Sequence, residues 1–290
     1  MENVLSRRQL LQLSVAASAA SVSRNSLFAR GRGIRVGVTD WNLKLASQPE
    51  ALGLAKRIGF AGLQVSLGRV PVRGQLPLTN SRFQLLYQAE SMKVEMPINA
   101  TCLDILHVNF LKSDKLALQW LAEGIEATKA LEAQVMLLPF FNKGAIETPA
   151  EKEYVADVLR EFAPAAEKAK VILALENTLS AADNAWIMDR TRSKAVKVYY
   201  DTYNSHKAGY DIYKEIRWLT SKRIAQVHFK DKGYLGEGEV DFNRVVRSLA
   251  DADYSSWANL ETPSPSGNVE ADMRRNFIFI KGVIERAPKA

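Results

Sequence analysis

The chain has 290 residues, of which 47% are hydrophobic and 24% are charged, with one cysteine and a formal net charge of +7. Such a composition is typical of a globular protein, and a single cysteine excludes both a disulfide framework and a cysteine-based zinc site. Residues 1–33 carry five arginines and one glutamate, which leaves 34 basic and 31 acidic side chains for the remaining 257 residues. That small surplus gives no argument for a nucleic-acid partner.

Residues 1–33 are expected to be a twin-arginine-like signal peptide and spacer, not part of the fold. Arg7 and Arg8 precede a short, weakly apolar stretch at residues 10–22, and residues 17–19 read Ala-Ser-Ala, as at a cleavage site. The alternative is a frayed amphipathic helix. We expect a periplasmic or otherwise exported protein after cleavage of this signal. No stable membrane anchor is expected, since no 18-residue stretch is apolar and free of charge.

From residue 34 onward, short apolar or β-branched runs alternate with longer stretches of helical pattern. Runs of this length are typical of strands that are buried on both faces of a parallel sheet. The expected strands are residues 34–40, 62–67, 94–101, 134–140, 171–177, 196–201, 223–230 and 256–261.

The clearest helices lie between these strands. Pro49 stands at a first-turn position, and Asp114 and Thr148 are suited to cap the helices that follow them. Pro164 is expected to kink or split the helix that contains it. The expected helices are residues 50–58, 114–131, 150–170, 210–220 and 269–286.

Eight strands that alternate with helices over 257 residues predict an α/β fold, a (β/α)₈ TIM barrel. An open doubly wound sheet is the alternative. It is disfavoured because residues 38–42, which end the first strand, lack a glycine-rich phosphate loop. No linker interrupts residues 34–286, so residues 34–290 are expected to form one domain.

Four chemically reactive residues end the last four predicted strands. Glu176, Asp201, His228 and Glu261 are separated by 25, 27 and 33 residues, each about one strand–helix unit. Because the carboxyl ends of barrel strands meet at one mouth, we expect these side chains to converge there. Three carboxylates and an imidazole suit a divalent ion such as Mn²⁺, Mg²⁺ or Co²⁺, with Zn²⁺ possible. Each residue alone is also compatible with a helix cap or a buried polar group.

The order and spacing of these motifs resemble the xylose-isomerase-like barrel superfamily, which includes sugar isomerases and epimerases. The resemblance implies that Glu176, Asp201, His228 and Glu261 bind one divalent metal, and that Glu176 and Glu261 also act as the acid–base pair. The segments that carry it are residues 175–177 (LEN), 200–204 (YDTYN), 227–231 (VHFKD), 235–242 (LGEGEVDF) and 260–261 (LE).

Five further residues are candidates for substrate contact. Asn204 stands where many epimerases of this superfamily carry a histidine; an amide can bind a sugar hydroxyl but cannot take up a proton. Lys230 follows His228 by two positions and so is expected on the inward face of its strand. Trp41 and Asn142 end two other strands. The resemblance implies that the loop containing Glu237 closes one side of the pocket.

The predicted function is therefore a metal-dependent sugar isomerase or epimerase. One glutamate would remove a proton next to a carbonyl, and the other would return a proton to the resulting enediolate. The same intermediate supports a lyase or hydrolase of 3-keto-glycosides, and a non-catalytic sugar-binding barrel is a further alternative. Export favours an unphosphorylated carbohydrate, since sugar phosphates are cytoplasmic. A nuclease is disfavoured because the chain has three histidines in all. A homo-oligomer is compatible with the sequence.

Overall fold

The structure is a computed structural model that describes residues 33–287. Arg7, Arg8 and the rest of the expected signal at residues 1–32 lie outside the described residues, so the export signal stays a prediction. None of the described helices is long and apolar enough to cross a membrane.

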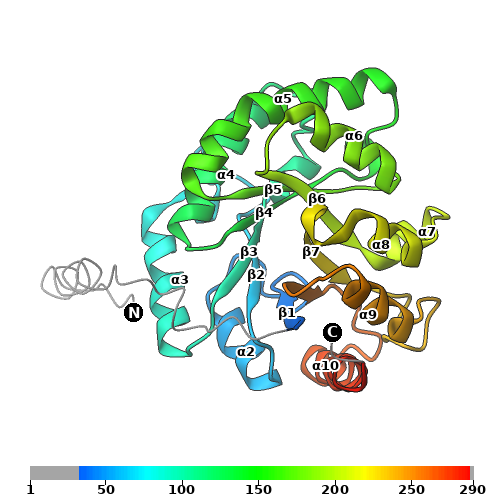
Figure 1. Cartoon of the computed structure of the whole chain (residues 1–290). Coiled ribbons are helices and arrows are strands. Elements are labelled where there is room, and N and C mark those ends of the chain that lie inside the picture. Colours follow the sequence, from blue (N-terminus) through cyan, green and yellow to red (C-terminus); the bar gives the residue numbers. More distant parts are fainter. Residues whose placement is uncertain (1–32, 288–290) are drawn as a thin grey trace, which may run out of the picture. The chain divides into compact units, whose positions relative to one another are not determined.

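Eight parallel strands close into a barrel in sequential order, with β1 hydrogen-bonded to both β2 and β8 (Figure 1). This confirms the predicted (β/α)₈ barrel. Because the strands are parallel and buried, their carboxyl ends all open at the same end of the barrel. The strands are β1 Arg35–Thr39, β2 Leu63–Ser66, β3 Ile98–Cys102, β4 Val135–Pro139, β5 Ile172–Glu176, β6 Val196–Asp201, β7 Ile224–Phe229 and β8 Trp257–Leu260.

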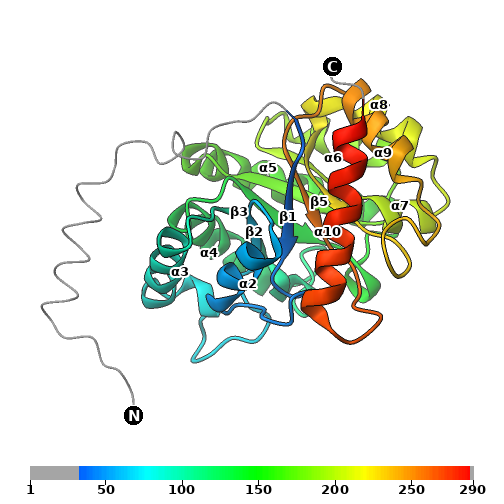
Figure 2. The same ribbon diagram turned by 90° about the horizontal axis from the view of Figure 1, so that it is seen from below.

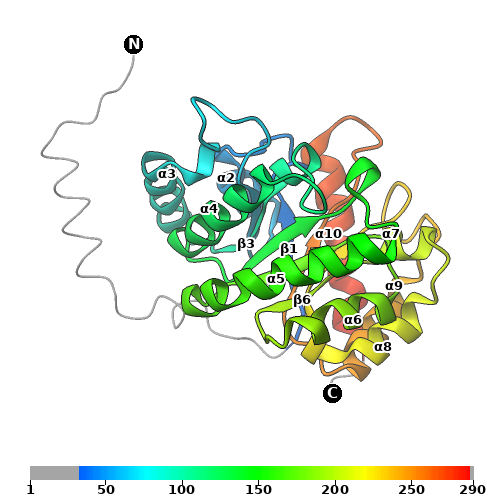
Figure 3. The same cartoon turned by 90° about the horizontal axis from the view of Figure 1, so that it is seen from above.

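Helices surround the barrel, with α5, α6 and α8 along one side and α10 beside β1 and α2 on another (Figures 2 and 3). Four of them, α3, α6, α7 and α9, are additional to the predicted set. In α3 the apolar residues Phe83, Leu85 and Leu86 are exposed, which hides the helical pattern. The helices are α2 Glu50–Ile58, α3 Ser81–Lys93, α4 Leu116–Ala130, α5 Pro149–Ala169, α6 Ala181–Thr191, α7 Thr202–Lys207, α8 Ile212–Arg223, α9 Phe242–Asp251 and α10 Val269–Arg286.

Helix α5 begins after the predicted capping residue, Thr148, but is not split by its internal proline. The Thr148 hydroxyl accepts from the amide of Glu151, and the Glu151 carboxylate accepts from the amide of Thr148, which forms a capping box. The helix then continues past Pro164 to Ala169. Pro164 and Arg160 are both exposed, so water can satisfy the Arg160 carbonyl that loses its helical partner. The expected division of this helix is therefore wrong.

The barrel interior is divided between apolar and polar sides. Most apolar side chains pack between the sheet and the helices, and a second, smaller cluster comes from strands β3 to β7. On the polar side, Gly37 in β1 leaves room for the side chains of Asn99 and Asn259, with which a Cβ at this position would collide. The smaller cluster comprises Ala100, Cys102, Val135, Leu137, Ala174, Tyr199 and Ala225.

Candidate functional site

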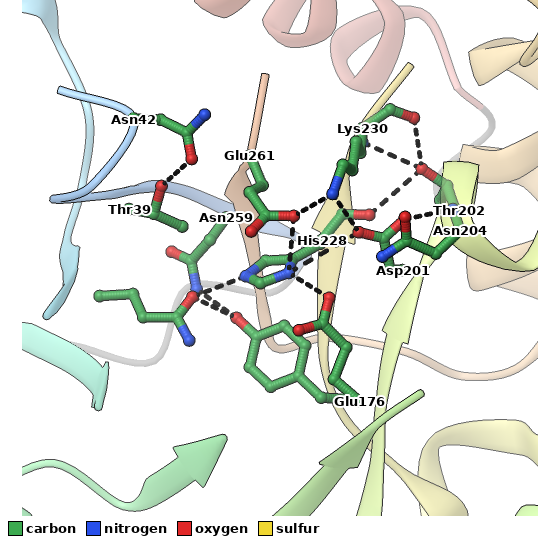
Figure 4. A network of polar contacts seen from close by, with 12 residues as sticks. Thr39, Asn42, Glu176, Asp201, Thr202, Asn204, His228, Lys230, Asn259 and Glu261 are labelled. Atoms are coloured by element: carbon green, nitrogen blue, oxygen red, sulfur yellow. Dashed lines mark hydrogen bonds and ion pairs between the residues drawn. The ribbon is translucent and has the colours of Figure 1, made fainter. Parts of the chain in front are cut away.

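The four predicted metal ligands converge at the carboxyl end of the barrel, as expected. Glu176 and Asp201 end β5 and β6, His228 is the penultimate residue of β7, and Glu261 follows β8 directly. One ligand atom from each residue lies within 4.8 Å of those from the other three. Figure 4 shows the carboxylates of Glu176, Asp201 and Glu261 gathered around the imidazole of His228.

The imidazole of His228 is fully buried, and its Nδ1 atom faces the carboxylates. Nδ1 lies 2.9 Å from Glu176 Oε1, 3.6 Å from Glu261 Oε2 and 3.9 Å from Asp201 Oδ2. Burial lowers the pKa of His228, but the charges of Glu176 and Glu261 outweigh burial and raise it. The carboxylates of Glu176 and Glu261 therefore stabilise the protonated form of the ring.

One oxygen of Asp201 is committed and the other is free of hydrogen bonds. Oδ1 caps α7 by accepting from the amide of Asn204 at 2.7 Å. Oδ2 is buried and accepts no hydrogen bond within residues 33–287. Burial, followed by the neighbouring carboxylates, raises the pKa of Asp201 despite the charge of Lys230. A buried carboxylate oxygen that accepts no hydrogen bond is suited to bind a cation.

Glu261 is held by two donors. Trp41 donates through Nε1 to Oε1 at 3.0 Å, and Lys230 donates through Nζ to Oε2 at 2.7 Å. Burial opposes ionisation of Glu261, but the charges of His228 and Lys230, together with these hydrogen bonds, lower its pKa to about 2. Glu261 is therefore ionised at neutral pH. Lys230 Nζ also lies 3.6 Å from Asp201 Oδ2, so this lysine neutralises part of the cluster.

The hydroxyl of Thr202 fixes the chain that carries Lys230. It accepts from the Lys230 amide at 3.0 Å and lies 2.8 Å from the Lys230 carbonyl oxygen. This pair of contacts ties the end of β7 to the start of α7, next to Asp201. Thr202 thus holds the backbone of Lys230 next to the residue that follows Asp201.

The four residues fit a divalent ion. Two ligand atoms at about 2.2 Å on opposite sides of an ion are about 4.4 Å apart, close to the spread of this quartet. Asp201 Oδ2 accepts no hydrogen bond from the described part of the chain, and Nδ1 of His228 points into the group, so both are placed as ligands. Three carboxylates and one imidazole match the preferences of Mn²⁺, Mg²⁺, Co²⁺ and Zn²⁺ and do not distinguish among them.

A cavity of about 820 Å³ opens above the quartet. Four of the five predicted substrate residues line it: Trp41, Asn142, Asn204 and Lys230. Glu176 and Glu261 line it as well. The cavity is therefore in contact with both proposed acid–base groups, and its walls carry amides, an indole and a lysine.

The fifth predicted residue, Glu237, is placed elsewhere. Its side chain is exposed, forms an ion pair with Arg275 of α10, and is not among the cavity-lining residues. Gly236 explains part of this position: it has a φ of +82° and packs against the ring of Phe279, which turns the loop toward α10. The loop therefore does not bring Glu237 to the cavity as expected.

Two groups of residues at the site were not predicted from the sequence. Asp104 and His107, which follow β3, line the cavity, with His107 Nε2 3.6 Å from Asp104 Oδ1. Beneath the quartet lies a buried set of uncharged polar residues, here called the amide layer: Gln64, Asn99, Tyr199, Gln226 and Asn259. The sequence contains a signal for it, because Tyr199, Gln226 and Asn259 each stand two positions before a quartet residue, on the same face of the strand.

Comparison with known proteins assigns the family. The model of the xylose isomerase-like TIM barrel family matches residues 52–282. The chain belongs to this family. It is 28% identical over 227 residues to a 2-epi-5-epi-valiolone 7-phosphate 2-epimerase of Actinoplanes sp. strain SE50/110, covering 74% of this chain and 82% of that relative.

Solved structures show the same fold. D-psicose 3-epimerase with D-tagatose from Clostridium cellulolyticum H10 superposes with a TM-score of 0.73 at 15% identity, covering 87% of this chain and 99% of the other. The IOLI protein with a bound zinc atom superposes with a TM-score of 0.71 at 16% identity, covering 89% and 100%. At these identities the likeness establishes the barrel alone.

Proposed function

We propose that this protein is a divalent-metal-dependent sugar isomerase or epimerase that abstracts a proton next to a carbonyl and works through an enediolate. The observation that carries the proposal is the quartet, whose four ligand atoms lie within 4.8 Å of one another at the base of an open cavity. The epimerase among its relatives and its family membership support the same class of reaction.

The chain's own residues account for the proton transfers. Glu176 and Glu261 come from β5 and β8 and flank His228, so they reach the cavity from different directions. One removes the carbon-bound proton, and the other returns a proton to the opposite face for epimerisation or to the neighbouring atom for isomerisation. Trp41 and Lys230 keep Glu261 oriented and ionised. A divalent ion bound by the quartet would polarise the substrate carbonyl as a Lewis acid.

The cavity walls suit a small carbohydrate. Asn142 and Asn204 offer amide groups to sugar hydroxyls, and Trp41 offers an aromatic face. We propose an unphosphorylated substrate, because the expected export signal would remove the enzyme from cytoplasmic sugar phosphates. Arg69 and Lys207 also line the cavity, so a substrate panel must include phosphorylated sugars.

Solvent deuterium incorporation tests the proposed reaction. Metal-loaded protein is incubated in heavy water with free sugars, keto-glycosides and sugar phosphates, and the carbon-bound protons are followed by NMR. An isomerase or epimerase incorporates deuterium at the carbon next to the carbonyl. Metal-loaded protein that turns over no sugar and exchanges no proton across the panel would instead be a sugar-binding barrel.

A second candidate reaction is β-elimination from a 3-keto-glycoside, and the pair formed by Asp104 and His107 favours it. In this reaction a glutamate removes the proton, a C=C bond forms, the C–O bond breaks, and the leaving oxygen takes up a proton. His107 lines the same cavity as Glu176 and is therefore placed to supply that proton. Its ring also stacks on Phe141, with centroids 6.3 Å apart.

The substitution H107A separates the two reactions. Elimination should lose roughly 10²-fold in turnover or more, because the leaving group loses its proton donor. Epimerisation of a monosaccharide should change by only a few fold. H206A is a suitable control, because His206 pairs with Glu239 and does not line the cavity.

We also propose that residues 1–33 direct export through the twin-arginine pathway. The double substitution R7K/R8K preserves charge but removes the arginine pair. It should retain the protein in the cytoplasm, as measured by cell fractionation. Unchanged delivery to the periplasm would contradict this proposal and would weaken the argument for an unphosphorylated substrate.

A further inference from the structure

We propose that Gln64 is a positioning residue for His228: its side-chain oxygen accepts the proton on Nε2 and thereby keeps Nδ1 available as a ligand. Gln64 Oε1 lies 2.8 Å from His228 Nε2, and both side chains are fully buried. The inference rests on the proposed function, because it concerns how His228 meets a cation.

The chemistry of imidazole makes this contact decisive. A neutral ring carries one N–H and one lone pair, so a metal at Nδ1 requires the proton to be on Nε2. That proton needs an acceptor in the barrel interior, since the ring has no exposed surface. The amide of Gln64 can present either its oxygen or its nitrogen to His228. Its orientation must therefore come from the groups around it.

The orientation begins at a backbone carbonyl, which can only accept. Gln226 donates through Nε2 to the carbonyl oxygen of Asn99 at 2.8 Å, and this fixes Gln226 Oε1 as an acceptor. Asn259 donates to that oxygen through Nδ2 at 3.0 Å. The other end of the Asn259 amide, Oδ1, accepts from Asn99 Nδ2 at 2.7 Å. The two amides thus hold each other in one arrangement.

Tyr199 passes this arrangement on to Gln64. Its hydroxyl accepts from Asn259 Nδ2 at 2.8 Å, so its own proton must go elsewhere. Gln64 Oε1 is 2.8 Å away, whereas Gln226 Oε1 is 3.2 Å away and already accepts from Asn259. Tyr199 therefore donates to Gln64. This leaves the oxygen of Gln64 facing both the hydroxyl and His228, and the same oxygen accepts from each.

Two further features support a positioning role. The ring of Tyr199 lies against that of His228, with centroids 4.4 Å apart. Tyr199 therefore both packs against the imidazole and donates the hydrogen bond that orients Gln64. The nitrogen of Gln64 has no hydrogen-bond partner within residues 33–287. Leaving that nitrogen unpaired costs stability, and the orientation persists because its oxygen has two donors.

Metal titration of four proteins tests the proposal. Metal-free wild type, Q64M, Q64E and Y254F are titrated with Mn²⁺ by calorimetry. Q64M keeps the length of the side chain but offers no acceptor, and should bind roughly 10–100-fold more weakly. Q64E accepts both protons and should bind within a few fold of wild type. Y254F is the matched control: this buried tyrosine donates to the Trp257 carbonyl at 2.6 Å and, within residues 33–287, forms no hydrogen bond with the amide layer.

The titration results separate the proposed function, the role of Gln64 and the orientation of its amide. Should wild type not bind Mn²⁺, the titrations are repeated with Mg²⁺, Co²⁺ and Zn²⁺; if wild type binds none of the four ions, the proposed function and this inference both fail. If wild type binds and Q64M binds equally well, only this inference fails. If Q64E binds as weakly as Q64M, Gln64 donates to His228 and the assignment of its orientation is overturned. Should Q64M not fold, Y199F replaces it: a severalfold loss of affinity is expected, and an unchanged affinity overturns the proposal.

Discussion

Two layers of the barrel interior lie next to each other and differ in almost every physical respect. The quartet places three carboxylates around one imidazole, with a single lysine to offset them. The amide layer beneath it is uncharged, and its members donate to one another in a connected network. The lower layer stabilises one arrangement of the barrel. The upper layer concentrates negative charge at the cost of stability, and a bound cation would offset that cost.

The largest expected effect comes from removing an acid–base group. E176Q and E261Q should each lower turnover by roughly 10²–10⁴-fold, with a smaller change in substrate affinity, since general acid–base catalysis contributes about that much. Metal content must be measured alongside, because both glutamates are also proposed ligands. E237Q is the control, since Glu237 is exposed and paired with Arg275 outside the cavity. A loss explained wholly by missing metal would assign these glutamates to binding alone.

Disrupting the amide layer should damage the fold itself. N259L removes the partner of Asn99, Tyr199 and Gln226, and each buried polar group left unpaired costs about 1–3 kcal/mol. We expect a decrease of at least that size in the free energy of unfolding, measured with urea. The exposed Asn243 provides the control N243L, which should stay within about 0.5 kcal/mol of wild type. Equal stability of N259L would contradict the role given to the layer.

Removing a carboxylate from the quartet should instead increase the stability of the metal-free protein. D201N removes a carboxylate whose ionisation is disfavoured first by burial and then by Glu176 and Glu261, while its amide oxygen can still cap α7. The metal-free variant should melt roughly 2–4 °C above metal-free wild type, which corresponds to about 1 kcal/mol in a protein of this size. Added Mn²⁺ should stabilise wild type and not D201N. A lower melting point for metal-free D201N would show that the quartet is not strained without an ion.

The smallest effect is expected at Glu151, a carboxylate outside the quartet that accepts several hydrogen bonds, and this effect depends on pH. Hydrogen bonds from Lys112 and from the amides of Glu147 and Thr148 lower the pKa of Glu151 to about 2. The unfolded chain then binds the proton more tightly, so this stabilisation is present above about pH 4.3 and is lost as pH falls toward 2. E151Q should therefore lose less stability than wild type over that range in acid unfolding. Its effect at pH 7 should be about 0.5 kcal/mol, at the low end of helix-capping contributions.

The sequence predicts the barrel and the quartet because both depend on regular repetition. One reactive residue ends each of four successive strands, and the closure of a parallel barrel brings those ends together. The amide layer obeys the same alternation, yet Gln64 by itself resembles interior filling, since its partner His228 is 164 positions away. The place of Glu237 depends on a left-handed turn at Gly236 and on Arg275, which no local pattern reveals.

Metal binding by the quartet is the central claim, and titration of metal-free protein with Mn²⁺ tests it most directly. We predict one ion per chain for wild type and no measurable binding at the same concentrations for the double variant D201N/H228A. The melting temperatures of both proteins without metal verify that each is folded. Wild type that binds no divalent ion, or a folded double variant that binds as tightly as wild type, would contradict the account.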